Sequence, residues 1–144
     1  MLIGIDPVLT PELLHALAAM GHGDRIVLVD ANYPATRGQR LIRLPGAGVV
    51  AALRAVLSVL PVDSFVEHPC AVMQVVGDAH AMPDVVAEMD AVLREFGNAA
   101  AVGMARHGFY AAAEAAYAIV QTGERRFYGN ILLTKGVIPP EVMP

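Results

Sequence analysis

His22 is the residue best placed for chemistry, because Gly21-His22-Gly23-Asp24 separates an apolar helical pattern from an apolar strand pattern. A glycine on each side of the histidine indicates a sharp turn, where the ring can face a pocket instead of the core. Asp30 closes the same strand, six residues after this turn. Imidazole exchanges protons near neutral pH, with an unperturbed pKa of roughly 6.5, and a carboxylate can orient it or bind a hydroxyl group. The two residues that bracket this strand therefore predict general acid–base chemistry.

Structural roles are the alternatives for the same residues. His22 can cap the carbonyl groups of the preceding helix, and spacing alone favours this role. Asp30 can cap the turn that follows it, and Tyr128-Gly129-Asn130 can be a bend that leads into the last strand. Short motifs also occur by chance, so the catalytic interpretation of each residue needs further support.

The elements that position these residues follow from capping signals and apolar spacing. Thr10 provides a hydroxyl cap, Pro11 the first helical position and Gly21 the stop of a first helix, 11–20. Ile26–Val29 is a short apolar run of the kind that forms a strand buried on both faces. Further helices are predicted over 49–60, 83–96 and 109–121, and further strands over 40–44, 71–76, 99–105 and 130–133. Because helices and strands alternate, we expect the α/β class, a single compact domain around one mixed or mostly parallel sheet.

Length and composition limit the class of protein. The 144 residues show no break in composition, so we expect one domain over residues 1–144. Apolar residues make up 56% of the chain and the mean hydropathy is +0.51, yet charges or prolines interrupt every apolar run well before the roughly 20 residues of a membrane span. No basic segment leads into an apolar stretch at the start, so no signal peptide is expected. The surplus of apolar residues instead predicts buried subunit interfaces, and hence a homo-oligomer.

Charge and cysteine content exclude further classes. The net charge is −4 and the basic residues are scattered, which argues against a nucleic-acid partner. Cys70 is the only cysteine, so no internal disulfide and no thiolate cluster can form, which fits a reducing cytoplasm. Asp78 and His80 lack a third metal ligand at suitable spacing, so a solvated turn is expected there. Gly46-Ala47-Gly48 lacks the third glycine of a dinucleotide site and is expected to be a helix-entry turn, so neither a metal nor a cofactor is predicted.

Several separated motifs together resemble one family. They are Leu9-Thr10-Pro11-Glu12-Leu13-Leu14, Met20-Gly21-His22-Gly23-Asp24, Asp30-Ala31-Asn32-Tyr33-Pro34, Phe109-Tyr110, Thr122-Gly123-Glu124, Tyr128-Gly129-Asn130-Ile131-Leu132-Leu133 and Lys135-Gly136-Val137. In this order, and over nearly the whole length, they resemble the L-fucose mutarotase and D-ribose pyranase family of small sugar-anomer isomerases. Gly-His-Gly-Asp and Tyr-Gly-Asn look like the fucose branch, since the ribose branch tends to carry threonine after the histidine and alanine between the tyrosine and the asparagine. Asn32 departs from those fucose-type members that carry histidine at this position, which leaves the exact sugar open.

The resemblance implies a cofactor-independent isomerase that opens and recloses the ring of L-fucose or a similar monosaccharide, and so interconverts its α and β anomers. It implies a ring-shaped homo-oligomer, typically a decamer, with sites near subunit boundaries. Asp30 either orients the histidine or binds a sugar hydroxyl group. Two alternatives are open: pyranose–furanose interconversion in the manner of D-ribose pyranase, and a non-catalytic monosaccharide-binding oligomer. The resemblance implies that the proton donor is His22 and that the sugar-binding residues are Asp30, Arg106, Tyr128, Gly129 and Asn130.

Overall fold

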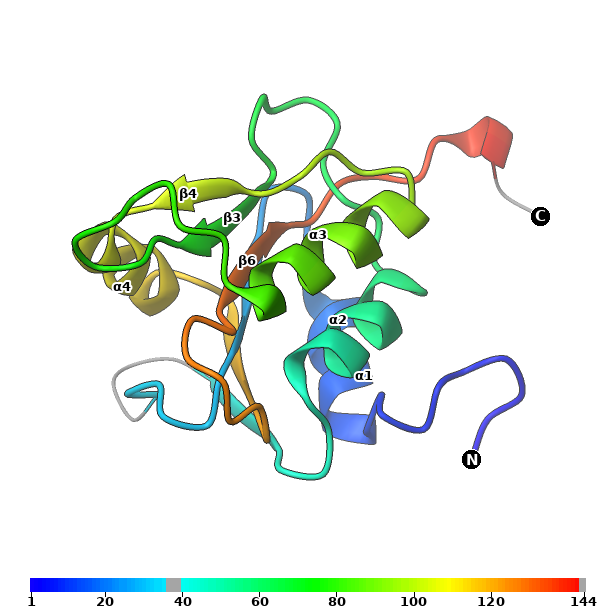
Figure 1. Ribbon diagram of the computed structural model, residues 1–144. Coiled ribbons are helices and arrows are strands. Elements are labelled where there is room, and N and C mark those ends of the chain that lie inside the picture. Colours follow the sequence, from blue (N-terminus) through cyan, green and yellow to red (C-terminus); the bar gives the residue numbers. More distant parts are fainter. Residues whose placement is uncertain (36–39, 143–144) are drawn as a thin grey trace.

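A six-stranded mixed sheet forms the centre of the protein, whose computed structural model describes residues 1–35 and 40–142 (Figure 1). β6 runs antiparallel to both of its neighbours, β1 and β3, and the other neighbouring strands pair in parallel. With helices between most of the strands, this arrangement confirms the predicted α/β class and its single mixed sheet. In spatial order the strands are β2 (Arg40–Leu44), β5 (Ala118–Thr122), β1 (Arg25–Val29), β6 (Ile131–Thr134), β3 (Cys70–Met73) and β4 (Val102–Met104).

Within the described ranges, four α-helices cover the two faces of this sheet. α1 (Pro11–Ala19), α2 (Val49–Leu57) and α3 (Asp84–Glu95) pack on one face, and α4 (Arg106–Glu114) packs on the other (Figure 1). A short 3₁₀ turn, η1 (Pro140–Val142), follows the last strand. None of the helices in residues 1–35 and 40–142 combines the length and the apolar character that crossing a membrane requires.

β1 shows why the apolar runs of the sequence become central strands. Ile26 and Leu28 face the core formed with α1, α2 and α3, whereas Val27 and Val29 face the smaller core beneath α4. All four side chains are fully buried. Because both faces of the strand are covered, the run is continuously apolar and shows no alternation with polar residues.

Lys135, which directly follows β6, closes the C-terminal end of α1. Its ammonium group donates hydrogen bonds to the carbonyl oxygens of Leu17, at 2.7 Å, and Met20, at 2.6 Å. A positive charge at the end of a helix satisfies carbonyl groups that have no partner within the helix. The structural interpretation of His22 as the cap of these carbonyls is therefore wrong, because Lys135 has this role.

One predicted element has the wrong type. The spacing predicts a helix over 109–121, but α4 ends at Glu114, and Ala118–Thr122 forms β5, which pairs with β1 and β2 near the middle of the sheet. Alanines recur through this segment and fit either type of element, so the helical spacing that begins with Phe109 and Ala113 extends beyond the true end of the helix. Several boundaries also differ by about three residues. The helix predicted over 49–60 ends at Leu57, and the helix predicted to begin at 109 begins at Arg106. The strand predicted over 71–76 spans Cys70–Met73, and the strand predicted over 99–105 spans Val102–Met104.

Candidate active site

The carboxyl ends of β1, β3 and β4 lie at one edge of the sheet, because these three strands run in the same direction. β6 runs in the opposite direction and therefore begins at this edge. Asp30 directly follows β1, Arg106 comes shortly after β4, and Asn130 directly precedes β6. Ligands of α/β proteins bind at this kind of edge, outside the carboxyl ends of the strands. The fold thus brings together residues as far as 100 positions apart in the sequence.

A cavity of about 230 Å³ opens at this edge. Asp30, Arg106, Tyr128 and Asn130 line it, and Gly129 is buried between the last two. Carboxylate, guanidinium, phenol and amide groups provide hydrogen-bond donors and acceptors for a ligand rich in hydroxyl groups. The volume lies below the roughly 300–1,000 Å³ of pockets for drug-sized ligands, so the cavity suits a smaller molecule. All of the predicted sugar-binding residues therefore lie at one cavity.

Asp30 is buried at this cavity, and hydrogen bonds hold both its side chain and its backbone in place. Its Oδ1 accepts a hydrogen bond from the backbone N–H of Asn32 at 2.9 Å, and its own N–H donates to Oδ1 of Asn130 at 2.9 Å. Burial raises the pKa of Asp30 above its ordinary value of 3.8, against the hydrogen bonds with Asn32 and Asn130, which lower it. Asp30 thus caps the turn after β1, as its structural interpretation predicts, and also contributes a carboxyl group to the cavity.

The turn before β6 places Tyr128, Gly129 and Asn130 around the cavity. Tyr128 has a positive φ of 66°, an uncommon conformation for a residue with a side chain. Its phenol oxygen accepts a hydrogen bond from the backbone N–H of Val76 at 3.1 Å, which ties this turn to the loop after β3. A Cβ added at Gly129 would lie 2.8 Å from Cγ of Glu124, so only glycine fits this position without displacing its neighbour. The bend is therefore built from a tyrosine in a strained conformation and a glycine in close contact.

Two tyrosines that spacing does not reveal form one wall of the cavity. Tyr33 and Tyr110 line the cavity with their ring centroids 5.4 Å apart, and the ring of Phe109 lies 6.2 Å from that of Tyr33. Edge-on contacts of this kind stabilise the packing of aromatic rings. Burial raises the pKa of Tyr33 above its ordinary value of 10.0, so its phenol group stays protonated and can donate a hydrogen bond. Both tyrosines belong to motifs of the family resemblance, which is the signal that could have identified them.

His22 lies at the opposite edge of the sheet from this cavity. It precedes β1, and the N–H of the adjacent Gly23 donates to the carbonyl oxygen of Lys135, just after β6, at 2.8 Å. The five residues of β1 separate this edge from Asp30 by a length of roughly 16 Å. The prediction that His22 and Asp30 form one pair is therefore wrong for a single chain, because a strand fixed within a sheet keeps its two ends apart.

Asp63 is the carboxylate that pairs with His22. Its Oδ1 lies 3.2 Å from Nε2 of His22, and the ring of Phe65 lies 5.5 Å from the imidazole. The side chain of Asp63 is only 2% exposed, whereas that of His22 is 46% exposed. The hydrogen bond from the N–H of Phe65, together with that from His22, lowers the pKa of Asp63, so the carboxylate stays ionised beside the ring. A buried carboxylate that orients an exposed imidazole is suited to proton transfer with a ligand on the exposed side of the ring.

The weaker sequence motifs have structural roles. Oδ1 of Asp78 accepts a hydrogen bond from the N–H of the exposed His80 at 3.3 Å, which confirms the predicted solvated turn. Gly48 is the N-cap of α2, so Gly46-Ala47-Gly48 is a helix-entry turn, as predicted. Among residues 1–35 and 40–142, no group of three or more His, Cys, Asp or Glu side chains is arranged to hold a metal ion.

Comparison with known proteins relates this arrangement to a family. Residues 3–138 match the RbsD/FucU transport protein family. The chain belongs to this family. It is 41% identical to the fucose mutarotase of Bos taurus, over 98% of this chain and 97% of that protein, and 44% identical to the fucose mutarotase of Homo sapiens, over 94% and 93%. The fold is similar to the crystal structure of the fucose mutarotase from Streptococcus pneumoniae in complex with L-fucose, with a TM-score of 0.90, 37% identity, and coverage of 96% of this chain and 100% of that chain.

Membership of the RbsD/FucU family confirms the resemblance that the sequence motifs predict. In this member of the family, the candidate residues form two groups at opposite edges of the sheet. The cavity with Asp30, Arg106 and Asn130 can hold the hydroxyl groups of a ligand. The pair of His22 and Asp63 can transfer a proton. The role of each residue stays a prediction.

Proposed function

We propose that this protein is a sugar mutarotase, an isomerase that interconverts the α and β anomers of L-fucose or a similar monosaccharide without a cofactor. The match to two fucose mutarotases, at 41% and 44% identity over 98% and 94% of the chain, carries the proposal. The cavity supports it, because charged and amide groups lie there beside apolar side chains, as binding a sugar requires. Residues 1–144 are proposed to act as one domain of this kind.

Anomer exchange requires two proton transfers at the sugar ring. Protonation of the ring oxygen, with loss of the proton from the anomeric hydroxyl group, breaks the bond between the anomeric carbon and the ring oxygen and leaves a free aldehyde. Rotation about the adjacent carbon–carbon bond presents the other face of the aldehyde, and reclosure reverses both proton transfers. Imidazole gives and takes protons near neutral pH, and general acid–base help accelerates such steps roughly 10²–10⁴-fold. His22 is the proposed acid, and Asp63 is proposed to orient it.

The cavity residues are proposed to bind and orient the sugar. The carboxyl group of Asp30 and the amide of Asn130 suit hydroxyl groups, and Arg106 offers donors in a fixed planar arrangement. Tyr128 adds a phenol group and an aromatic surface. Phe127, which is 72% exposed at the cavity, provides an apolar surface for the methyl group of a 6-deoxy sugar.

His22 is proposed to act in the cavity of a neighbouring copy within a ring-shaped homo-oligomer, a decamer as the family resemblance implies. Within one chain the histidine and the cavity lie at opposite edges of the sheet. Both edges carry exposed apolar side chains: Phe65, 74% exposed, lies beside His22, and Phe127 and Val76 lie at the cavity. Burial of these side chains between copies is favourable. Such a contact would also join the acid to the sugar-binding residues.

Interconversion of the ring forms of D-ribose is the second candidate function. Asn32 lines the cavity and is the position that leaves the sugar open. A monosaccharide-binding oligomer without catalysis is a further alternative, and the pair of His22 with the ionised Asp63 argues against it. A panel that includes L-fucose and D-ribose separates these candidates.

The cytoplasm is the proposed location. Cys70 is the single cysteine of the chain, and burial raises the pKa of its thiol to about 12. A buried protonated thiol is inert. A chain without disulfides suits a reducing compartment.

NMR exchange spectroscopy on a panel of sugars, with L-fucose first and EDTA present, tests the proposed activity. We expect the parent protein to accelerate exchange between the anomeric signals. His22→Ala should remove roughly 10²-fold or more of this acceleration while sugar binding falls less. His15→Ala is the matched control, because His15 is an exposed histidine of α1 outside the proposed site, and it should keep the parent rate.

Two outcomes would contradict the proposed activity, and a third would contradict only the role of His22. Exchange no faster than in buffer for every sugar of the panel would remove the enzyme assignment. Sugar binding without faster exchange would favour the monosaccharide-binding alternative. Acceleration that survives in His22→Ala would keep the activity and remove His22 as its acid.

A further inference from the structure

Glu124 is a buried carboxylate behind the turn that carries Tyr128 and Asn130, and its side chain is only 8% exposed. Its Oε1 accepts hydrogen bonds from the backbone N–H and from Nε of Arg126, both at 3.0 Å, and its Oε2 accepts one from Nη2 of Arg126 at 3.1 Å. The start of α2 lies beside this carboxylate, since a Cβ added at Gly48, the N-cap of α2, would lie 3.4 Å from Oε2 of Glu124. A buried polar group with this many partners is rigidly held.

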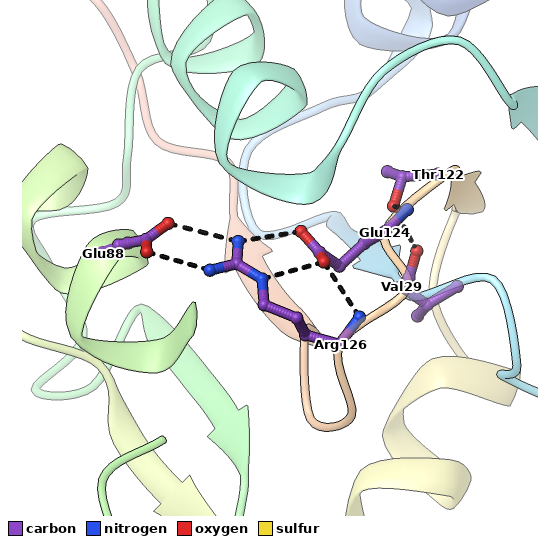
Figure 2. Close-up of polar contacts among 5 residues, drawn as sticks. All are labelled: Val29, Glu88, Thr122, Glu124 and Arg126. Carbon is purple, nitrogen blue, oxygen red and sulfur yellow. Dashed lines mark hydrogen bonds and ion pairs between the residues drawn. The ribbon is translucent and has the colours of Figure 1, made fainter. Parts of the chain in front are cut away.

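Arg126 extends the contact to α3. Its Nη1 and Nη2 donate to Oε1 and Oε2 of Glu88, at 2.9 and 3.1 Å, so the guanidinium lies between two carboxylates (Figure 2). Arginine binds carboxylates most strongly through paired hydrogen bonds of this kind. The hydrogen bonds from Arg126 lower the pKa of Glu124 to about 2, although burial opposes them, so the cluster stays charged at neutral pH. The cluster links the start of α2, the loop before β6 and the exposed side of α3.

Thr122 fixes the other side of Glu124. Its hydroxyl group donates to the carbonyl oxygen of Val29 at 2.8 Å and accepts a hydrogen bond from the N–H of Glu124 at 3.2 Å (Figure 2). Val29 is the last residue of β1 and directly precedes Asp30. The end of β5 is thereby joined to the end of β1 at the point where the cavity begins.

Glu124 also contacts two of the segments that carry sugar-binding residues, the one after β1 and the turn before β6. Its carbonyl oxygen accepts a hydrogen bond from the N–H of Ala31, the residue after Asp30, at 2.8 Å. Its Cγ also lies close to Gly129, since a Cβ added at Gly129 would lie only 2.8 Å from the Cγ of Glu124. A displacement of Glu124 would therefore move the segment of Asp30 and the Tyr128–Asn130 turn together.

We propose that Glu124 and Arg126 are positioning residues of the sugar site: their ion pair, anchored on α3 through Glu88, holds the Tyr128–Asn130 turn in the conformation that binds the sugar. The inference rests on the proposed function. Neither side chain lines the cavity, so the pair acts on the fraction of molecules with a competent turn and not on the reacting atoms. A lower competent fraction weakens apparent binding by the same factor, and saturating sugar restores the competent state. A raised KM with an unchanged kcat is the expected signature.

Arg126→Met is the main variant, because the side chain is 44% exposed and its removal leaves the hydrophobic core intact. Arg54→Met is the matched control. Arg54 forms a paired contact of the same kind with Glu95 of α3, both bonds at 3.0 Å, with both side chains half exposed. We expect Arg126→Met to raise the KM for L-fucose roughly ten-fold with little change in kcat, and the control to leave both unchanged. Arg126→Lys keeps the charge but loses the planar guanidinium, so its KM should lie between that of the parent protein and that of Arg126→Met.

A second variant and a substrate-free measurement keep the test decisive if the main variant unfolds. Glu88→Gln changes an exposed position, keeps the pair with Glu124 and loosens only the anchor on α3, so it should raise KM by a smaller factor. Amide hydrogen exchange at Val76, whose N–H donates to the phenol oxygen of Tyr128, reports on the turn without any sugar. This amide should exchange faster in both variants of the cluster and at the parent rate in the control.

Each other outcome overturns the inference. A parent KM and parent amide exchange in the main variant would show that the pair does not hold the turn. A loss of kcat with an unchanged KM would place the pair in the chemistry. Equal effects in the control would show a general loosening of α3. If the parent protein accelerates exchange of no sugar, the proposed function fails separately, and the amide exchange at Val76 still decides whether the pair holds the turn.

Discussion

A mixture of two inactive variants tests whether His22 acts in the cavity of a neighbouring copy. His22→Ala removes the proposed acid and keeps the cavity, whereas Asp30→Asn changes the cavity and keeps the acid. The two positions lie at opposite ends of β1, so each variant leaves the other half of the site unchanged. If each site takes its acid from one chain and its cavity from another, mixed oligomers contain sites with both parts intact.

The size of the rescue follows from counting sites. In oligomers assembled at random from equal amounts, the cavity is intact in half of the sites and the acid is intact in half, so about one quarter of the sites are complete. His22→Ala alone is expected to keep roughly one hundredth of the parent acceleration or less, because a general acid contributes 10²–10⁴-fold. The mixture should therefore be far more active than either variant. If the acid and the cavity came from the same chain, no mixture would contain a complete site.

Co-expression of the two chains with different affinity tags, followed by purification on both tags, isolates the mixed oligomers. NMR exchange spectroscopy of L-fucose then gives the acceleration per chain. As a control, His22→Ala chains are mixed with chains that carry both substitutions, which supply no intact acid and should give no rescue. Mixed oligomers as inactive as the single variants would refute the two-chain site. A parent protein that sediments near the 15.2 kDa mass of one chain would refute it as well.

Three further predictions concern single residues. Asp63→Asn should lower the acceleration roughly 10–100-fold, by analogy with the loss when a group that orients a metal-bound histidine is changed. It should add no further loss in His22→Ala, and additive losses would contradict the pairing. Asp30→Asn should raise the melting temperature at pH 7 but not below pH 3.8. Burial raises the pKa of Asp30, so ionisation of this side chain lowers the stability of the folded protein as the pH rises above 3.8. A lower melting temperature of Asp30→Asn at pH 7 would refute this. Lys135→Met should lower the free energy of unfolding by about 1–3 kcal/mol in denaturant titrations, because two carbonyl groups of the α1 end lose a charged donor; an unchanged free energy would disprove the cap.

Most elements of the fold could be predicted because each carries its own local pattern. The start of α1 follows from Thr10, whose hydroxyl oxygen accepts a hydrogen bond from the N–H of Leu13 at 3.3 Å. β1 follows from a continuous apolar run, since both of its faces are covered. β5 could not be predicted, because Ala118–Thr122 continues an alanine-rich helical spacing and becomes a strand only through its pairing with β1 and β2. Tertiary pairing decides such a segment, and the local pattern does not contain it.

The candidate site divides in the same way. The cavity residues lie at strand ends and in motifs, so they could be identified from the sequence, although their shared cavity depends on the direction of each strand. The partner of His22 could not be identified from the sequence, because Asp63 lies 41 positions away from it. Asp63 reaches the histidine because an isolated β-bridge pairs the adjacent Val62 with Lys135. The carbonyl oxygen of Lys135 in turn accepts a hydrogen bond from the N–H of Gly23, next to His22. A contact that depends on the pairing of two distant segments leaves no spacing to recognise.

The antiparallel pairing of β1 with β6 accounts for the proposed two-chain site, because it places the acid and the cavity of one chain at opposite edges of the sheet. Asp30 and Asn130 lie where β1 ends and β6 begins, whereas His22 and Lys135 lie at the other ends of the same two strands. The buried core of these short strands fixes the orientation of both halves at once, so a neighbouring copy has only to place one edge against the other. A head-to-tail contact of this kind repeats from copy to copy, and it ends only when the ring closes. In a closed ring every copy provides one acid and one cavity to different neighbours. The acid and the cavity of each site then come from two different chains, and the variant type of one chain does not depend on that of the other. This independence is what makes about one quarter of the sites complete in the mixed oligomers.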